Sequence, residues 1–210
     1  MLPLARSSGM LRPMPTHPRP YHHGNLRDAL LDAAERLLER KGAGALALRA
    51  IARAAHVTHT AAYHHFDDRE ALLRALAARG FDRFAAALAS AGQRAPPERG
   101  FLEVGVAYVR FAAEHPALFR LMFGAEVARG RRADDALGAA SDRALGVLLD
   151  GVRASAPGLD EAAVRRRAAA AWAIVHGLSG LLLDGQLAAL GLGSEDPERV
   201  AREILSGEPT

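Results

Sequence analysis

The chain has 210 residues, of which 50% are apolar and 24% charged, so it can fold around a sizeable core. It contains no cysteine, which excludes disulfides, thiol nucleophiles and cysteine-bound zinc. The formal net charge of +3 permits a polyanionic partner but does not require one. Abundant alanine, with few aromatic and β-branched residues, favours an all-helical protein.

Residues 1–20 carry prolines at a density that cannot continue a helix, together with arginines and no acidic residue. They are typical of a disordered, basic tail, which could reach a DNA minor groove or have no role. The tail lacks the apolar run of a signal peptide. The uncharged run at 168–183 contains five alanines, two glycines, a serine and His176, and it is shorter than the roughly 20 strongly apolar residues of a membrane span. We therefore expect a cytoplasmic protein without a membrane partner.

Apolar residues recur at three- and four-residue steps and predict about nine helices. In chain order, these cover residues 26–41, 48–55, 59–66, 67–89, 97–115, 117–123, 134–154 and 160–187, with a last short helix from 197. Residues 129–132 are predicted to form a loop. The expected N-terminal caps are Gly24 or Asn25 for the first helix, Asp67 with Glu70 for the fourth, and Asp160 for the long penultimate helix.

Two short helices joined by three residues, and followed at once by a long helix, form a helix-turn-helix pattern. Leu48, Ile51 and Phe66 cannot be buried within two turns, so the first helix must supply an apolar wall. The outward face of the second short helix is rich in hydrogen-bond donors and has no acidic residue before Asp67. Such a helix suits insertion into the major groove of DNA.

The stretch from 21 to about 81 resembles the DNA-binding domain of the TetR family (tetracycline-repressor-like) of bacterial transcriptional regulators. The matching residues are those at 30–34, 48–52, 57–58, 63–66 and 68–73. Residues 21–27 are similar to a subgroup whose second domain has a Trp-His-Gly signature, which appears here as Trp172, His176 and Gly177. The resemblance implies three parts: the tail at 1–20, a DNA-binding domain at 21–81, and an effector-binding and dimerisation domain at 82–210.

Roles in DNA binding follow from the resemblance position by position. Arg49 would approach a base edge or a phosphate. Bases would be read by His59, Thr60, Ala61 and His64, and phosphates would be held by Tyr63, His65 and Arg69. His65, beside Phe66, could instead be half-buried packing.

Two positions depart from the family pattern. Ala47 stands where a capping hydroxyl is common, so one backbone anchor for phosphate could be missing. His56 replaces the usual turn glycine and must tolerate left-handed backbone geometry.

The resemblance also implies that the second domain encloses a cavity for a small, often apolar effector. The candidate lining residues are Phe111, His115, Phe119, Met122, Phe123, Trp172 and His176. The aromatic residues and the methionine are most simply explained as core packing. The alternative for each histidine, which we favour for either one taken singly, is a buried group with a satisfied hydrogen bond or a residue at a helix end.

Seven of the nine histidines precede residue 66. The pairs at 22–23 and 64–65 are adjacent, however, and adjacent helical residues point about 100° apart, which is poor chelating geometry. We predict no metal and no cofactor.

No nucleophile–histidine–acid spacing, paired carboxylates or phosphate loop is present, so we do not predict an enzyme. A helical enzyme or carrier for an apolar molecule is the alternative, and a DNA-packing protein would leave the large second domain unexplained.

The function implied by the resemblance is a homodimeric regulator that binds a palindromic operator and is released by a ligand. The recognition helices of the two protomers would lie about 34 Å apart or at a related spacing. Dimerisation would use the helix at 160–187 and a neighbouring helix. The fourth helix would join the DNA-binding part to the cavity.

Overall fold

The structure, a computed structural model, describes residues 23–130 and 135–207. The described residues form ten α-helices and three short 3₁₀ helices and no strand, which confirms the all-helical prediction. The helices are α1 His23–Lys41, α2 Leu48–Ala54, α3 His59–Tyr63, α4 Arg69–Arg94, α5 Gly100–Glu114, α6 Pro116–Phe123, α7 Ala125–Gly130, α8 Ala136–Ser155, α9 Glu161–Leu183 and α10 Pro197–Ser206. The 3₁₀ helices are η1 Ala43–Ala45, η2 Pro97–Arg99 and η3 Gln186–Leu190. The tail predicted at 1–20 lies outside the described residues.

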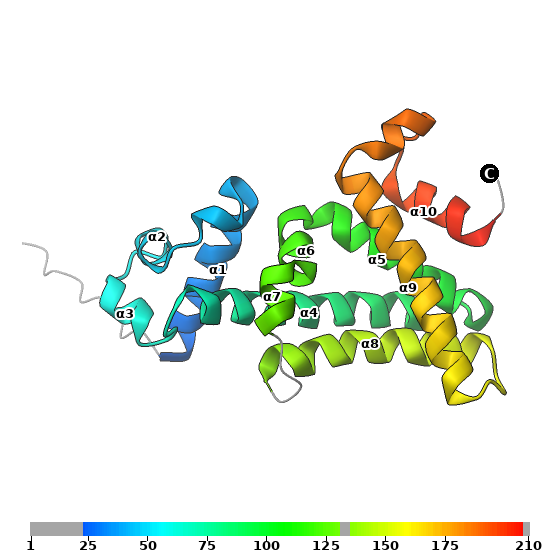
Figure 1. The fold of residues 1–210 in the computed structure, drawn as a ribbon, viewed down its shortest axis with the longest axis horizontal. Helices are drawn as coiled ribbons and strands as arrows, with labels where there is room; N and C mark the ends of the chain where they lie inside the picture. The colour runs from blue at the N-terminus through cyan, green and yellow to red at the C-terminus, as the bar shows by residue number, and fades with distance from the viewer. Residues whose placement is uncertain (1–22, 131–134, 208–210) are drawn as a thin grey trace, which may run out of the picture.

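Helices α1, α2 and α3 and the first turns of α4 pack into a small N-terminal unit, at the left in Figure 1. Its core contains Leu30, Leu38, Ile51, Phe66 and Leu72, each at most 3% exposed. The apolar wall that α1 was predicted to supply is therefore present. Below, the assembly of α1–α3 with the start of α4 is called the head.

The second part of the chain is a bundle around α4. Helix α4 lies alongside α8 and α5, α9 packs on α5 and α8, and α10 packs on α5 (Figure 1). The apolar residues of α4 that recur at helical spacing, from Leu73 to Leu88, are buried. Because α4 continues from the head into the bundle, the two parts share one helix. No helix of the described residues is both long and apolar enough to cross a bilayer.

Several predicted helix ends were wrong. Helix α1 begins at His23, so Gly24 and Asn25 lie inside it and do not cap it. Helix α3 ends at Tyr63, three residues before the predicted end. The N-cap of α4 is Asp68, whose carboxylate accepts from the Ala71 amide at 2.6 Å, and not Asp67.

Further along the chain, α4 extends to Arg94, and Arg129 belongs to α7, where a loop was predicted. Helix α9 ends at Leu183, Asp184 and Gly185 form a turn, and Gln186 and Leu187 already belong to η3. The predicted cap of α9 is correct, because the Asp160 carboxylate accepts from the Ala163 amide at 2.6 Å. The predicted start of α8 at residue 134 lies outside the described residues, and the observed N-cap is Asp135.

The turn between α2 and α3 has the left-handed backbone that the sequence predicted. His56 has φ 57°, and it is the one non-glycine residue with positive φ in the described ranges. A non-glycine residue with this left-handed backbone costs about 1–2 kcal/mol. Glycine avoids that cost, but it loses more backbone entropy on folding, which offsets part of the gain. His56→Gly should therefore raise the free energy of unfolding by up to about 1 kcal/mol. Urea unfolding checks this: a higher midpoint with an unchanged m-value is expected, and a lower midpoint would contradict it.

Candidate DNA interface and effector cavity

The exposed face of α3 carries polar and aromatic side chains and no acidic residue. His59, Thr60, Tyr63 and His64 are exposed, whereas Ala62 and Phe66 point into the core of the head. Thr58 caps the helix, with its hydroxyl accepting from the Ala61 amide at 3.2 Å. Ala61 and His65 are half-buried, at the edge of this face. The face is thus open to a partner along four of the predicted positions.

Helix α2 begins without a side-chain cap, as its N-terminal alanine predicted. Ala47 has an extended backbone and makes no capping hydrogen bond. Arg49 lies in the first turn of α2 and is exposed. The head thus offers an exposed cation on α2, although the hydroxyl that often completes such an anchor is missing.

Arg69, the first residue of α4, is held by two groups outside its own helix. Its Nη1 pairs with the Glu126 carboxylate of α7, and its Nη2 donates to the Ala43 carbonyl of η1 at 3.0 Å. No sequence pattern indicated this contact, because Glu126 is 57 residues away along the chain. A DNA phosphate would have to share or replace these partners.

The head also contacts the bundle through α1 and α6. The Glu39 carboxylate accepts from the Leu118 amide in the first turn of α6 at 3.3 Å. Arg83 of α4 pairs with Glu35 of α1 and donates through Nη2 to His115 Nε2 at 3.2 Å. Arginine can only donate, so this nitrogen of His115 is the acceptor. His115 therefore lies at the junction of head and bundle.

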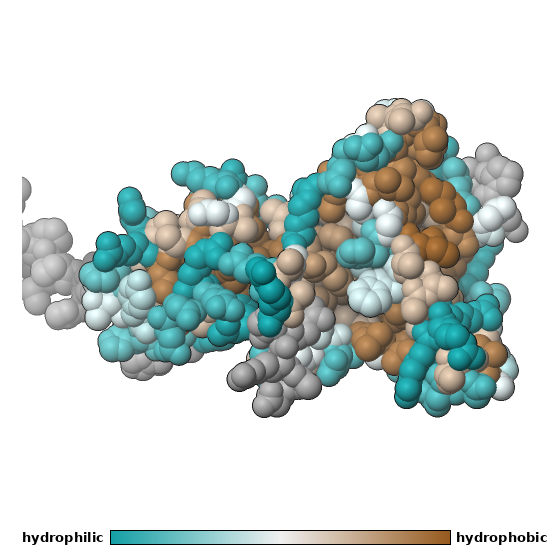
Figure 2. Space-filling view, in the orientation of Figure 1, coloured by the Kyte–Doolittle hydropathy of each residue, from teal (hydrophilic) through white to brown (hydrophobic). Residues whose placement is uncertain are grey.

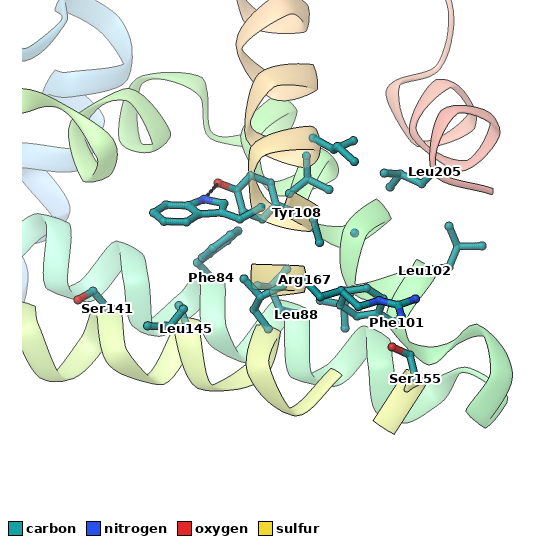
Figure 3. A pocket seen from close by; sticks show the side chains of 18 of the residues that line it. Phe84, Leu88, Phe101, Leu102, Tyr108, Ser141, Leu145, Ser155, Arg167 and Leu205 are labelled. Carbon is teal, nitrogen blue, oxygen red and sulfur yellow. Dashed lines mark hydrogen bonds between the residues drawn. The ribbon is translucent and has the colours of Figure 1, made fainter. Parts of the chain in front are cut away.

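A cavity of about 450 Å³ lies in the bundle (Figure 3). Aromatic and aliphatic side chains from α4, α5, α8 and α9 form most of its wall, and Leu205 of α10 closes part of it. Its volume and apolar lining are typical of a small-molecule site. The rings in the wall are Phe81, Phe84, Phe101, Tyr108, Phe123 and Trp172.

Two of the seven residues predicted for an effector site, Phe123 and Trp172, line this cavity. Phe111, Phe119 and Met122 are buried in the core, where the ring of Phe111 contacts Phe84 and that of Phe119 contacts Tyr108. His115 lies at the junction described above, and His176 lies behind Tyr108. Phe84 and Tyr108 also line the cavity, although their spacing in the sequence indicated only an inward helical face.

Two polar side chains of the cavity wall, Trp172 and Tyr108, meet a third, His176, which lies behind the wall. The Trp172 indole donates to the Tyr108 hydroxyl at 3.1 Å, and that oxygen lies 2.8 Å from His176 Nδ1. Burial raises the pKa of the Tyr108 phenol above its ordinary value, and the bond from Trp172 opposes this only in part. Burial also lowers the pKa of His176 below 6.5, so the imidazole is neutral at pH 7.5.

One side of α9 is exposed and apolar. Ala170, Ala173, Ile174, Gly177 and Leu181 follow each other at helical spacing and are all exposed. Figure 2 shows apolar residues gathered over the C-terminal part of α9 and the elements that follow it, whereas the first turns of α9 are hydrophilic. Small side chains allow another helix to approach closely. This face, called the α9 face below, is available to a partner.

An exposed, acid-free α3 in a helix-turn-helix head, joined to a helical bundle with an apolar cavity, defines a DNA-binding transcriptional regulator. A model of bacterial regulatory proteins of the tetR family matches residues 30–76, and a model of the tetracyclin repressor-like C-terminal domain matches residues 101–207. The chain therefore belongs to the TetR family, as the sequence predicted. The family is one of regulators that bind DNA, dimerise and respond to small molecules.

Solved structures agree with this assignment. A protein of unknown function from Rhodococcus sp. RHA1 is 35% identical, with 90% of this chain and 96% of that chain covered and a TM-score of 0.73. The TetR family transcriptional regulator PfmR from Thermus thermophilus is 21% identical (84% and 94% covered, TM-score 0.62) and shares the fold. So does a tetR family regulatory protein from Rhodococcus RHA1, at 20% identity (86% and 93% covered, TM-score 0.64). Among curated proteins, none matches the chain.

Proposed function

We propose that this regulator is a repressor that binds a palindromic operator as a homodimer in the bacterial cytoplasm and is released by a small apolar effector. The observation that carries the proposal is the joining of two features by one helix. Arg69 begins α4, six residues after the end of α3, and Phe84 of the same helix lines the cavity. These residues are separated by 15 positions, or about 22 Å along a helix.

The DNA contacts follow from the exposed face of the head. We assign base reading to His59, Thr60, Ala61 and His64, and phosphate contacts to Arg49, Tyr63, His65 and Arg69. The absence of acidic residues from residue 48 to residue 66 supports this assignment, because a carboxylate there would repel the DNA backbone.

The effector would occupy the cavity, where Phe123 and Trp172 are the predicted residues in direct reach. Release requires the ligand to bind better to a form in which the two heads are wrongly spaced. A shift of α4 would move the head directly. The contacts of Glu39 with α6 and of Arg69 with α7 would carry a shift of those short helices to the head as well.

Two finer assignments belong to the same proposal. The Trp-His-Gly subgroup is supported by the position of Trp172 and His176 at and behind the cavity wall. The domain boundary after residue 81 falls inside α4, so the DNA-binding and effector-binding parts would act as units that share this helix.

Fluorescence anisotropy tests the function. The DNA upstream of the protein's own gene is compared with a scrambled duplex at two salt concentrations. Nanomolar, sequence-selective binding is expected for a regulator, whereas salt-sensitive but unselective binding would indicate DNA packing. No binding to either duplex would favour the helical enzyme or carrier.

The assigned roles predict different effects for two head residues. His64→Ala should change the sequence preference, because it removes a base contact. Arg69→Ala should weaken binding to all duplexes alike and reduce the salt slope by about one, because it removes a phosphate contact. Anisotropy with a set of single-base operator variants at several salt concentrations separates the two effects. Equal loss of discrimination in both variants would contradict the assignment.

A further inference from the structure

The Tyr108 hydroxyl sits in the cavity wall with both of its protein neighbours fixed. The Trp172 indole can only donate, so the Tyr108 oxygen accepts from it (Figure 3). The side chain of Tyr108 is only 6% exposed, so bulk water does not compensate for an unmade bond. The Tyr108 oxygen also lies 2.8 Å from His176 Nδ1, and one proton is shared between these two atoms.

Two arrangements of that proton are possible. If His176 Nδ1 carried it, the tyrosine oxygen would accept twice and its own O–H would point without a partner into an apolar cavity, which is unfavourable. If Tyr108 donates to Nδ1, its O–H is satisfied, and the N–H at Nε2 belongs to a half-buried ring that water can reach. Tyr108 therefore donates to His176, and its oxygen keeps one lone pair that none of the described residues uses.

The other hydroxyls of the wall also use their protons within the protein. Ser141 donates to the Gly138 carbonyl at 2.9 Å, and Ser155 donates to the Val152 carbonyl at 3.1 Å. Arg167 is the cationic hydrogen-bond donor among the lining residues, and this arginine is exposed. The hydroxyl groups thus present acceptors to a bound molecule.

We propose that the cavity selects an apolar molecule carrying a hydrogen-bond donor, such as a hydroxyl or N–H group, which donates to Tyr108. His176 is then a positioning residue, because it holds the Tyr108 proton away from the ligand and does not contact the ligand itself. The inference rests on the proposed effector function of the cavity.

Ligand binding can be measured without DNA, because Trp172 is the only tryptophan and lines the cavity. Its fluorescence is titrated at pH 7.5 with 1-decanol, with its isomer methyl nonyl ether, and with decanoate. One hydrogen bond corresponds to a roughly 2- to 10-fold preference, so decanol should bind that much more tightly than the ether. Decanoate should bind more weakly than decanol, since it offers Tyr108 no donor.

Two variants and one control isolate the Tyr108 hydroxyl. Tyr108→Phe should bring decanol and the ether to equal affinity. The control Ser90→Ala, which removes a hydroxyl of α4 outside the cavity wall, should leave the preference unchanged. His176→Phe removes the acceptor of the Tyr108 proton, so the freed O–H can donate to a ligand and the preference should move toward the ether.

The outcomes separate the inference from the function on which it rests. Equal binding of alcohol and ether by the unaltered protein, tighter binding of decanoate, or a preference that survives both Tyr108→Phe and His176→Phe would overturn donor selection while leaving an effector cavity in place. If none of the three ligands changes the fluorescence, the effector function itself is contradicted and the inference falls with it. Operator binding by the ligand-free protein tests the regulator role separately.

Discussion

Replacing Gly177 by glutamate should make the protein monomeric and weaken its binding to a palindromic operator by on the order of 100-fold or more. In this chain, a Cβ at Gly177 would meet nothing within 4 Å, so the folded protomer can accept the side chain. In a two-fold dimer through the α9 face, the same position contacts the partner's copy of that face, and two carboxylates would be buried near each other. Each head would then bind only its own half-site.

The control for this variant is Ala86→Glu, which adds the same charge at an exposed position on α4, away from the α9 face. Analytical ultracentrifugation gives the mass, anisotropy gives the operator affinity, and thermal unfolding shows that both variants fold. A dimeric Gly177→Glu protein that binds the operator like the unaltered chain would show that the α9 face is not the dimer interface.

The head was predictable because its signals are local. The spacing of Leu48, Ile51 and Phe66 determined which sides of α2 and α3 are buried, and His56 marked the left-handed turn. The cap of α4 was misplaced by one residue because Asp67 and Asp68 are adjacent and only the backbone shows which carboxylate reaches an amide. Local pattern therefore identifies an element better than its exact ends.

The cavity and the junction were not predictable, because their contacts join residues far apart in sequence. Tyr108 and His176 are separated by 68 positions, and Arg69 and Glu126 by 57. In the sequence, Tyr108 is one apolar-face residue of α5 among several, and its role depends on which helix covers that face. His115 likewise was open to more than one interpretation in the sequence. In the structure it is the C-cap residue of α5 and its ring is hydrogen-bonded to Arg83.

Replacing Phe84 by alanine should lower the free energy of unfolding by about 3–5 kcal/mol. Phe84 is 2% exposed, and its ring lies edge-on to Tyr108 at 4.9 Å and to Phe111 at 5.0 Å between ring centroids. Its removal loses these contacts and adds a void to an existing cavity, which the surrounding helices cannot fill by small movements. Because α4 joins the cavity to the head, the looser packing should also weaken any coupling between the two.

Leu145→Ala is the matched control, because Leu145 lines the same cavity but is 44% exposed, and its truncation should change stability by only about 0.5 kcal/mol. Urea unfolding at pH 7.5 measures both variants, with the m-value as a check that the unfolded states are comparable. The two variants should differ because the Phe84 ring packs against Tyr108 and Phe111, whereas Leu145 borders open solvent. A similar loss of unfolding free energy in the two variants would mean that the aromatic cluster does not hold α4 against α5. The proposal that α4 couples the cavity to the head would then have no physical basis.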